Sequence, residues 1–408
     1  MTCPVLCMSA VTALVLPSIT SGQTAPYPHR SEPIGTVRQM YGGELTPALA
    51  VNTFRNIDRL FPTRTVSSGS ARPLPLPRAA VPLTDVRFTD KGKQYDLAAY
   101  LQLNRVAAIL VLDSGRVKLE RYRFGNTEHT RWMSMSVAKS ITSTLVGAAV
   151  KEGRISLSDP VTRYVPSLAG SAYDGVSVRD VLMMSSGVGW NETYTDPSSD
   201  RRRLLDAQIS QVPGSALAIM KSLPRAAEPG MKFNYNTGEA QVLAEVLRAG
   251  VGRPLATYLS DRIWSRVGME ADANWWLDSP DGTEIGGSGF SATLRDYGRF
   301  GLFVLGGGVA GGDSILPAGW IQEATTPKVL RDGSALEYGY LWWPGSGGAF
   351  MATGIHGQYV YVNPAAQVVI VVWGARPHPT AGQVVDDWTF CDAVTAAVRS
   401  TSHVRSER

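Results

Sequence analysis

Strand-forming stretches lie on both sides of a long helical region in this 408-residue chain, and this order restricts the fold more than any other feature. Residues 106–112 are apolar, residues 113–115 have the composition of a turn, and residues 117–124 form a second strand, as in a β-hairpin. Three further short strands are predicted at residues 349–354, 359–363 and 368–373. This order predicts one antiparallel sheet assembled from both ends of the chain, with a helical subdomain inserted, which is an α+β fold.

Helical periodicity and composition divide the chain into predicted parts. Residues 238–250 carry apolar side chains at helical spacing, and a last helix is predicted from about residue 383 to residue 399. We expect an α/β subdomain made of residues 83–154 and 331–408, and a mostly helical subdomain made of residues 155–330. The active site is expected where the sheet and the helical insert meet.

The first 82 residues differ in composition from the rest. Residues 5–19 form a short apolar run and residues 20–25 are mostly small, as in a secretory signal peptide, although a basic start is absent. We therefore predict a signal peptide at residues 1–25 and a periplasmic or secreted protein, with a cytoplasmic location as the alternative. Residues 26–82, rich in Pro, Ser, Thr and Arg, are predicted to be a linker or an extension that wraps the surface. No stretch is long enough to form an integral membrane segment.

Charge and composition argue against several classes of function. The net charge is only +4, and the one dense basic run, the arginines at positions 201–203, is predicted to be a solvated loop, so no nucleic-acid partner is expected. The three cysteines, Cys3, Cys7 and Cys391, give no disulfide framework. The five histidines show no H-x-H or H-E-x-x-H pattern, so we expect no metal site.

A serine and a lysine one helical turn apart, Ser136 and Lys139, stand at the start of a helical pattern. At this spacing the two side chains lie on the same face of the helix. A partly desolvated lysine can lose its proton and act as a base for the serine hydroxyl, and the helix start offers backbone N–H groups for an oxyanion. A solvated helix face is the alternative, but Trp132, Met133 and Met135 favour burial.

Two further stretches carry groups suited to act with this pair. Tyr235 could relay a proton to and from Ser136, although a buried tyrosine with a satisfied hydroxyl is the alternative. In residues 352–358 a strand ends at a tight turn, where Gly354 would let a substrate approach the strand edge. The Ile355 N–H could then point at an acyl oxygen, with an ordinary hairpin as the alternative.

In this order and at these spacings, the three elements resemble the serine β-lactamase-like hydrolases. This family includes class C β-lactamases, D-alanyl-D-alanine carboxypeptidases, family VIII esterases and 6-aminohexanoate-dimer hydrolases. The likeness runs from about residue 106 to the last helix. It is closest to the 6-aminohexanoate-dimer hydrolases, whose pattern is approached by residues 135–140, 191–197, 233–235 and 354–358. The resemblance implies a β-lactamase/transpeptidase-like fold, an antiparallel sheet flanked by helices with an all-helical subdomain, and neither cofactor nor metal.

The resemblance also implies roles for individual residues. Ser136 would be the acyl-accepting nucleophile, Lys139 and Tyr235 would handle protons, and the N–H groups of Ser136 and Ile355 would form the oxyanion hole. Tyr194 would contact a substrate amide. The residues predicted to bind substrate are Trp190, Glu192, Tyr194, Trp343, Gly354 and His356. A Ser-His-Asp site that uses His356 is not expected, because the chain has no G-x-S-x-G elbow, and His356 is better interpreted as a turn residue.

Two departures from the family pattern narrow the substrate. Ala352 stands where β-lactamases and carboxypeptidases have the lysine of Lys-Thr-Gly, so the cation for a substrate carboxylate is missing there. Thr237 replaces the asparagine of Tyr-x-Asn. The predicted function is a serine hydrolase that cleaves small linear amides or carboxylic esters through an acyl-enzyme. A β-lactamase or D-Ala-D-Ala carboxypeptidase is one alternative, and a non-catalytic ligand-binding module on the same fold is another.

Overall fold

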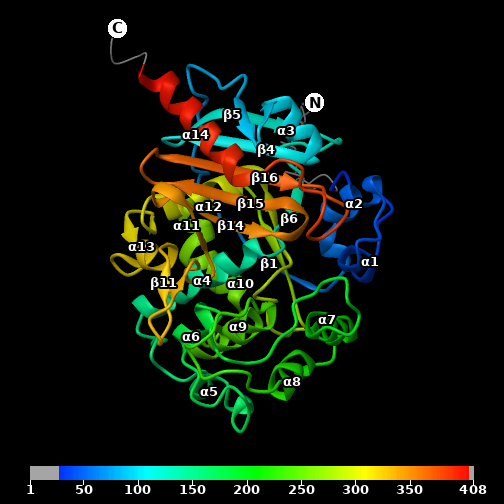
Figure 1. Cartoon of the computed structure of the whole chain (residues 1–408), viewed down its shortest axis with the longest axis vertical. Helices are drawn as coiled ribbons and strands as arrows, with labels where there is room; N and C mark the ends of the chain where they lie inside the picture. Colours follow the sequence, from blue (N-terminus) through cyan, green and yellow to red (C-terminus); the bar gives the residue numbers. More distant parts are fainter. Residues whose placement is uncertain (1–26, 404–408) are drawn as a thin grey trace, which may run out of the picture.

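A six-stranded antiparallel sheet dominates one half of the molecule, as the computed structural model in Figure 1 shows; residues 27–403 are described. The strand order is β13-β14-β15-β16-β4-β5. The strands are β4 (Val106–Asp113), β5 (Arg116–Tyr122), β13 (Trp343–Pro344), β14 (Phe350–Gly354), β15 (Gln358–Asn363) and β16 (Val368–Gly374). Strand β16 pairs with β4, with Ile370 opposite Val111, so the two ends of the chain meet at the centre of the sheet. The predicted α+β fold with one antiparallel sheet is confirmed; the short edge strand β13 was not predicted.

Helices cover both faces of this sheet, which is why β4 is apolar almost throughout rather than alternating. Helix α12 (Leu294–Leu305) packs on β4, β15 and β16, and α3 (Leu97–Leu103) and α14 (Asp387–His403) belong to the opposite side. Helix α14 starts four residues later than predicted, because the Asp386 carboxylate accepts a hydrogen bond from the Thr389 N–H at 2.8 Å and caps it there.

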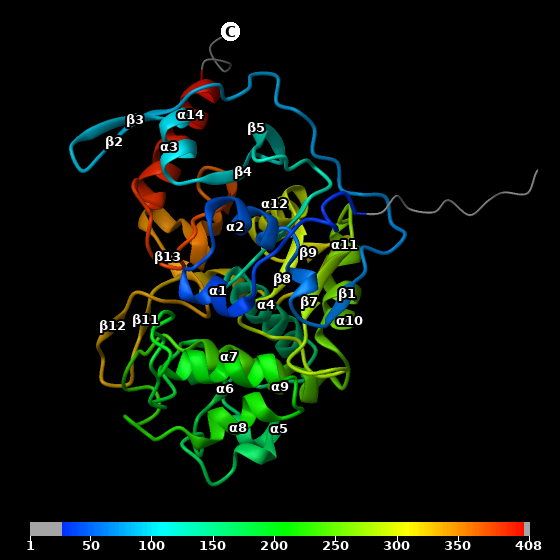
Figure 2. The same ribbon diagram turned by 90° about the vertical axis from the view of Figure 1, so that its right-hand side faces the viewer.

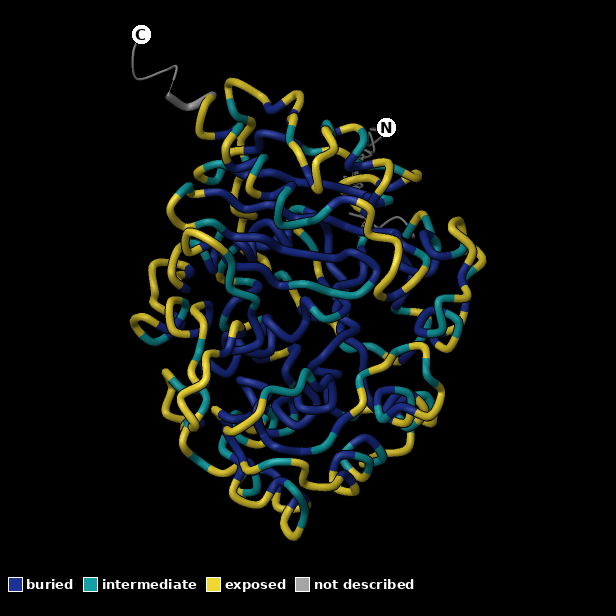
Figure 3. The backbone as a smooth tube through the Cα atoms, in the orientation of Figure 1, coloured by how far each residue is buried: buried dark blue, intermediate teal, exposed yellow. Residues whose placement is uncertain are grey.

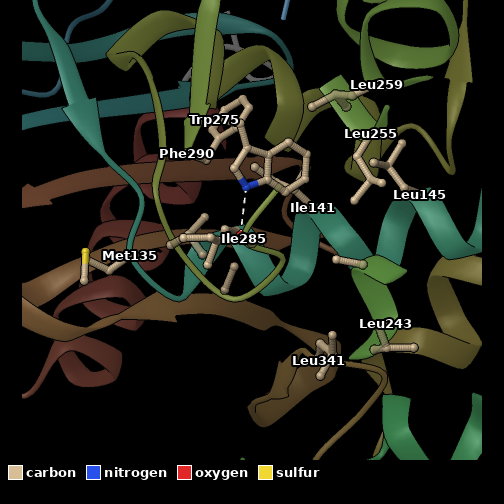
Figure 4. Packing of buried hydrophobic residues seen from close by; sticks show 14 of the residues in the cluster. Met135, Ile141, Leu145, Leu243, Leu255, Leu259, Trp275, Ile285, Phe290 and Leu341 are labelled. Atoms are coloured by element: carbon tan, nitrogen blue, oxygen red, sulfur yellow. Dashed lines mark hydrogen bonds between the residues drawn. The ribbon is translucent and has the colours of Figure 1, made fainter. Parts of the chain in front are cut away.

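The other half of the molecule is mostly helical and packs around α4 (Val137–Lys151) and α9 (Thr237–Val251). Its other helices are α5 (Val161–Tyr164), α6 (Val178–Leu182), α7 (Asp200–Ser210), α8 (Ser215–Ser222), α10 (Leu255–Leu259) and α11 (Ser265–Val267). Buried residues run without interruption from the strands into these helices (Figure 3). Figure 4 shows part of this core, where the Trp275 indole N–H donates to the Ile285 carbonyl at 2.9 Å. Helix α12 lies within residues 155–330 but packs on the sheet, so it is part of the sheet half in space. The division of the chain at residues 155 and 330 stays a prediction.

The N-terminal extension forms defined elements against the rest of the chain (Figure 2). It contains α1 (Val37–Gly42), α2 (Pro47–Phe54) and β1 (Thr63–Val66). Helix α2 is capped by Thr46, whose hydroxyl accepts from the Leu49 N–H at 3.3 Å, and Pro47 is its first residue. Strand β1 joins an unpredicted four-stranded sheet, β1-β7-β8-β6, with β6 (Arg131–Met133), β7 (Ala273–Trp276) and β8 (Phe290–Thr293). The predicted signal peptide lies outside the described residues.

Three small hairpins and one short helix are the remaining β-strands and α-helix of the described residues. They are β2 (Arg87–Asp90) with β3 (Lys93–Asp96), β9 (Val309–Ala310) with β10 (Asp313–Ser314), β11 (Lys328–Val329) with β12 (Ala335–Leu336), and α13 (Trp320–Thr325). Within residues 27–403, no helix combines the length and the apolar character needed to cross a bilayer.

Candidate active site

Ser136 and Lys139 meet at the start of α4, as their spacing predicts. Ser136 precedes the first helical residue, and Met135 before it has a positive φ of 42°, which turns the chain sharply from β6 into the helix. The Lys139 Nζ lies 2.7 Å from the Ser136 Oγ and 3.1 Å from the Gly287 carbonyl. Lys139 is 1% exposed, whereas Ser136 is half-buried and lines a cavity. The hydroxyl is therefore accessible and the amine beneath it is not.

Burial of Lys139 changes the proton affinity of its amine. Removal of the ammonium from water lowers the pKa of Lys139 from 10.5 to about 7. The Glu192 carboxylate opposes this shift, and the Arg201 guanidinium adds to it. At neutral pH a substantial fraction of Lys139 is thus uncharged and able to accept a proton.

Tyr235 lies over this pair, immediately before the cap of α9. Its phenol and the Ser136 side chain line the same cavity, and the Lys139 Nζ is 5.2 Å from the centre of its ring. The ring stacks on Trp343 with centroids 5.9 Å apart. Burial raises the pKa of Tyr235 above its usual value, and Glu192 adds to this effect, so the phenol is a donor at neutral pH.

The end of β14 comes very close to the start of α4. A Cβ added to Gly354 would lie 2.6 Å from the Ser134 carbonyl oxygen and 3.0 Å from the Ser136 backbone nitrogen. No side chain fits at Gly354 without displacing the backbone that carries Ser136. The end of β14 therefore lies directly against the backbone of Ser136, and the approach of a substrate to this strand edge stays a prediction.

A cavity of about 370 Å³ opens above Ser136. Five of the other predicted site residues share its lining: Tyr194, Tyr235, Trp343, Gly354 and Ile355. The rest of the lining comes from β14, from residues 357–359 and from residues 376–388; sequence reasoning did not assign residues 376–388 to the site. Among the lining residues the only cationic side chain is Arg376, whose guanidinium is paired with Asp387 at 2.9 Å.

Three residues predicted to bind substrate, Trp190, Glu192 and His356, are not among the residues that line this cavity. The His356 ring is fully buried, contacts Phe54, and shares a 2.8 Å hydrogen bond with the Arg376 carbonyl. Burial lowers the pKa of His356 to about 4, and its φ of 67° agrees with its interpretation as a turn residue. The Trp190 indole N–H donates a hydrogen bond to the Glu192 carboxylate at 2.5 Å, and neither residue lines the cavity.

Sequence reasoning missed Arg201 and Tyr41. The arginine run was predicted to be a solvated loop, but it lies in α7, and Arg201 is 1% exposed with its guanidinium 4.3 Å from the centre of the Tyr41 ring. Tyr41, from α1, also packs against Tyr194 at 6.1 Å between ring centroids. A run of like charges gives no sign that one of its members is buried, and only helical periodicity through Leu204 and Leu205 could have indicated it.

Comparison with known proteins agrees with this geometry. A beta-lactamase family model matches residues 102–389. A 6-aminohexanoate-dimer hydrolase from Paenarthrobacter ureafaciens is 33% identical over 345 residues, which cover 80% of this chain and 85% of that protein. The chain belongs to the beta-lactamase family.

Solved structures of this family show the same fold. A Bacillus anthracis protein assigned as a 6-aminohexanoate-dimer hydrolase superposes with a TM-score of 0.77 at 24% identity, covering 86% of this chain and 94% of that one. A family VIII carboxylesterase superposes with a TM-score of 0.57 at 17% identity, covering 74% and 95%. As a member of the beta-lactamase family, the protein is a serine hydrolase.

Its two departures from the beta-lactamase family pattern have structural counterparts. Ala352 is buried and does not line the cavity. The Thr237 hydroxyl, at the position of the family's asparagine, donates to Glu192 at 2.5 Å rather than facing a substrate. In the described part of the chain, no cluster of three or more His, Cys, Asp or Glu side chains is arranged to hold a metal ion.

Proposed function

We propose that this protein cleaves small linear amides or carboxylic esters through an acyl-enzyme formed on Ser136. The observation that carries the proposal is the 2.7 Å contact between the Ser136 Oγ, which faces the cavity, and the buried Lys139 Nζ, whose pKa is about 7. A nucleophile within hydrogen-bond reach of a base that is partly neutral at working pH is the basic requirement of covalent catalysis.

Acylation would begin with proton transfer from Ser136 to neutral Lys139 as the Oγ attacks the substrate carbonyl. The carbonyl oxygen would accept hydrogen bonds from the Ser136 and Ile355 N–H groups, because Gly354 brings the end of β14 against the start of α4. The C–N or C–O bond then breaks, and the leaving group takes a proton. Tyr235, a protonated phenol that lines the same cavity as Ser136, is suited to deliver it.

Deacylation would reverse these roles. Water attacks the acyl carbonyl and passes a proton to the Lys139–Tyr235 pair, and Ser136 leaves after regaining its proton. The Gly287 carbonyl accepts from the Lys139 Nζ at 3.1 Å, which keeps the amine aimed at the Oγ through the cycle.

The lining of the cavity supports a small, linear substrate. Its aromatic members include Tyr194, Tyr235, Trp343 and Trp388, which offer apolar contact to an alkyl chain. The 33% identical relative is named for the hydrolysis of 6-aminohexanoate dimer, a linear amide, and a fold relative is a carboxylesterase. A free cation for a β-lactam or peptide carboxylate is not among the lining residues.

A fluorophosphonate probe tests the proposal directly. The parent protein should be labelled, and mass spectrometry should place the adduct on Ser136. Ser136→Ala should abolish labelling and hydrolysis of p-nitrophenyl esters. Ser143→Ala is the matched control, because the Ser143 hydroxyl lies in the same helix, buried and without a hydrogen-bond partner. Absence of labelling in folded parent protein would favour the ligand-binding module instead.

Export remains part of the proposal. It rests on the apolar run at residues 5–19 and the small residues that follow. Sequencing the N-terminus of protein recovered from the periplasm or medium would test it, and an intact N-terminus on cytoplasmic protein would contradict it.

A further inference from the structure

The Glu192 carboxylate accepts hydrogen bonds from two segments near the site, although Glu192 does not line the cavity. Its Oε2 accepts from the Trp190 indole N–H at 2.5 Å and from the Thr237 backbone N–H at 2.9 Å. Its Oε1 accepts from the Thr237 hydroxyl at 2.5 Å, and the Tyr194 phenol lies near enough to the same carboxylate to feel its charge. A carboxylate accepts about four hydrogen bonds, so little capacity remains for a substrate group.

Two of these donors belong to the segment that carries Tyr235. Thr237 is the first residue of α9, two positions after Tyr235, and the Asn236 side chain caps the helix by accepting from the Glu239 N–H at 3.2 Å. Glu192 takes up a second N–H that the helix start leaves free, where negative charge is also favourable. Glu192 thereby fixes the backbone next to Tyr235.

The third donor, the Trp190 indole N–H, belongs to the loop before α7. Trp190 and Tyr194 flank Glu192 in this loop, and only Tyr194 reaches the cavity. The Arg202 guanidinium also donates to the Tyr194 carbonyl at 3.1 Å, so the loop is held from both sides. One carboxylate thus connects the loop that carries Tyr194 with the segment that carries Tyr235.

The charge of Glu192 acts on the same groups. It opposes the effect of burial on the Lys139 pKa, whereas Arg201 reinforces that effect. It adds to burial in raising the pKa of both Tyr194 and Tyr235, which keeps the two phenols protonated. The groups that experience this charge are Lys139, Tyr194, Arg201, Tyr235 and Tyr338.

We propose that Glu192 is a positioning residue: its carboxylate ties the Tyr194 loop to the segment of Tyr235 and holds both phenols at the Ser136–Lys139 pair without touching substrate. This inference rests on the proposed function. It replaces the predicted substrate contact of Glu192 with an indirect role.

Glu192→Gln tests the inference, because the amide keeps the shape but loses the charge and presents an N–H₂ group to donors. We expect kcat for an amide substrate to fall about 10²-fold, as for a small misplacement of catalytic groups. The acid limb of the kcat/KM profile should move to lower pH, because the charge that favours protonated Lys139 is gone. Arg201→Met should move this limb to higher pH. If Glu192 had a purely structural role, Glu192→Gln and Arg201→Met would lower the rate but would not shift the acid limb in opposite directions.

Thr237→Val removes one donor and keeps the charge, so kcat should fall while the acid limb stays in place. If thermal denaturation shows that Glu192→Gln is poorly folded, Thr237→Val still tests the positioning role of Glu192. Asp196→Asn is the matched control, since this carboxylate lies in the same loop and bonds to the Ser198 N–H and hydroxyl at 2.9 and 2.7 Å. Its rate and pH profile should equal those of the parent.

Unchanged kcat and an unchanged acid limb in folded Glu192→Gln would overturn the inference, as would unchanged kcat in Thr237→Val. Fluorophosphonate labelling of each variant separates this failure from failure of the proposed function. Labelled parent protein with an unaffected Glu192 variant contradicts only the positioning role. Unlabelled parent protein contradicts the acyl-enzyme itself.

Discussion

Among single residues, Lys139 shows how burial produces chemistry. A lysine in water is charged far above neutral pH and cannot accept a proton. Here the amine is enclosed, touches the Ser136 hydroxyl and the Gly287 carbonyl, and has a pKa of about 7. Burial of a cation is unfavourable, and the protein avoids that cost in part by letting the amine lose its proton.

The pH dependence of the reaction follows from this pKa. Below about pH 7, Lys139 is mostly protonated and cannot accept the Ser136 proton, so kcat/KM should rise with pH through a midpoint near 7. Stopped assays between pH 5 and pH 9 on a p-nitrophenyl ester would measure it. A rate that is flat or falling from pH 6 to pH 8 would contradict the role of Lys139 as base.

Gly354→Ala tests the close approach of β14 to α4. The added methyl group would lie 3.0 Å from the Ser136 nitrogen and 2.6 Å from the Ser134 carbonyl oxygen, so one of the two segments must move. We expect kcat to fall by about 10²–10³-fold, the scale of losing an oxyanion-hole donor. Steady-state kinetics would measure this, with circular dichroism to verify folding. Wild-type kcat would show that the site tolerates displacement of the strand end.

Tyr194→Phe separates amide from ester chemistry. The Tyr194 phenol lines the cavity and stays protonated, so it can orient a leaving nitrogen, which departs readily only once protonated. Amide turnover should fall about 10–10³-fold, and turnover of an activated ester much less, because its leaving group needs no such help. Equal losses on both substrates would indicate packing or uniform binding instead.

At the scale of secondary-structure elements, helix α1 places part of the N-terminal extension beside the catalytic region. Thr36 caps α1 through a reciprocal pair of hydrogen bonds with Gln39, which fixes the start of a six-residue helix. The helix then directs Tyr41 into the core, where it contacts Tyr194 and Arg201. The extension thus stabilises the loop and the helix that form the wall behind the cavity.

Tyr41→Ala should weaken both stability and substrate binding. Truncation of a fully buried aromatic side chain costs about 3–5 kcal/mol, and the resulting space would loosen Tyr194. We expect a lower midpoint of urea denaturation together with a higher KM. Tyr41→Phe keeps the ring and should retain most of both properties. A stability loss with an unchanged KM would show that α1 supports only the fold.

At the scale of the whole molecule, segments distant in sequence assemble the site at the junction of the sheet and the helical half. Ser136 and Lys139 come from α4, Tyr235 from the segment before α9, and Gly354 from the end of β14. Residues from 376 to 388, which include the start of α14, also line the cavity. Its carboxylates, Asp386 and Asp387, and the paired Arg376 leave no free cation among the lining residues.

This charge distribution predicts weak activity on β-lactams. A charge-assisted hydrogen bond to a substrate carboxylate contributes about 1.5–3 kcal/mol, or roughly 10–100-fold in kcat/KM. Nitrocefin turnover should therefore lie well below ester turnover, as spectrophotometric assays of both substrates would show. Efficient hydrolysis of penicillins would mean that another part of the molecule supplies the cation.

The local sequence determined the elements and the central pair. Apolar β4 and β16, the periodicity of α9 and α12, and the Ser136–Lys139 spacing depend on neighbours within a few residues, so their patterns are legible without tertiary contacts. The family resemblance added the roles of Tyr235 and Ile355 and the predicted substrate contact of Tyr194. Gly354 was predicted to belong to the site because a strand ends at a tight turn there.

Only the tertiary structure decided which polar side chains face the cavity and which lie behind it. Arg201 and His356 are polar residues whose local sequence resembles a surface segment or a turn, yet both are fully buried by contacts with α1 and α2, more than 100 residues away in the chain. Glu192 was predicted to bind substrate, but its oxygens are occupied by Trp190 and Thr237. Burial and hydrogen-bond occupancy are properties of the assembled chain, because they depend on donors and walls that distant segments bring together.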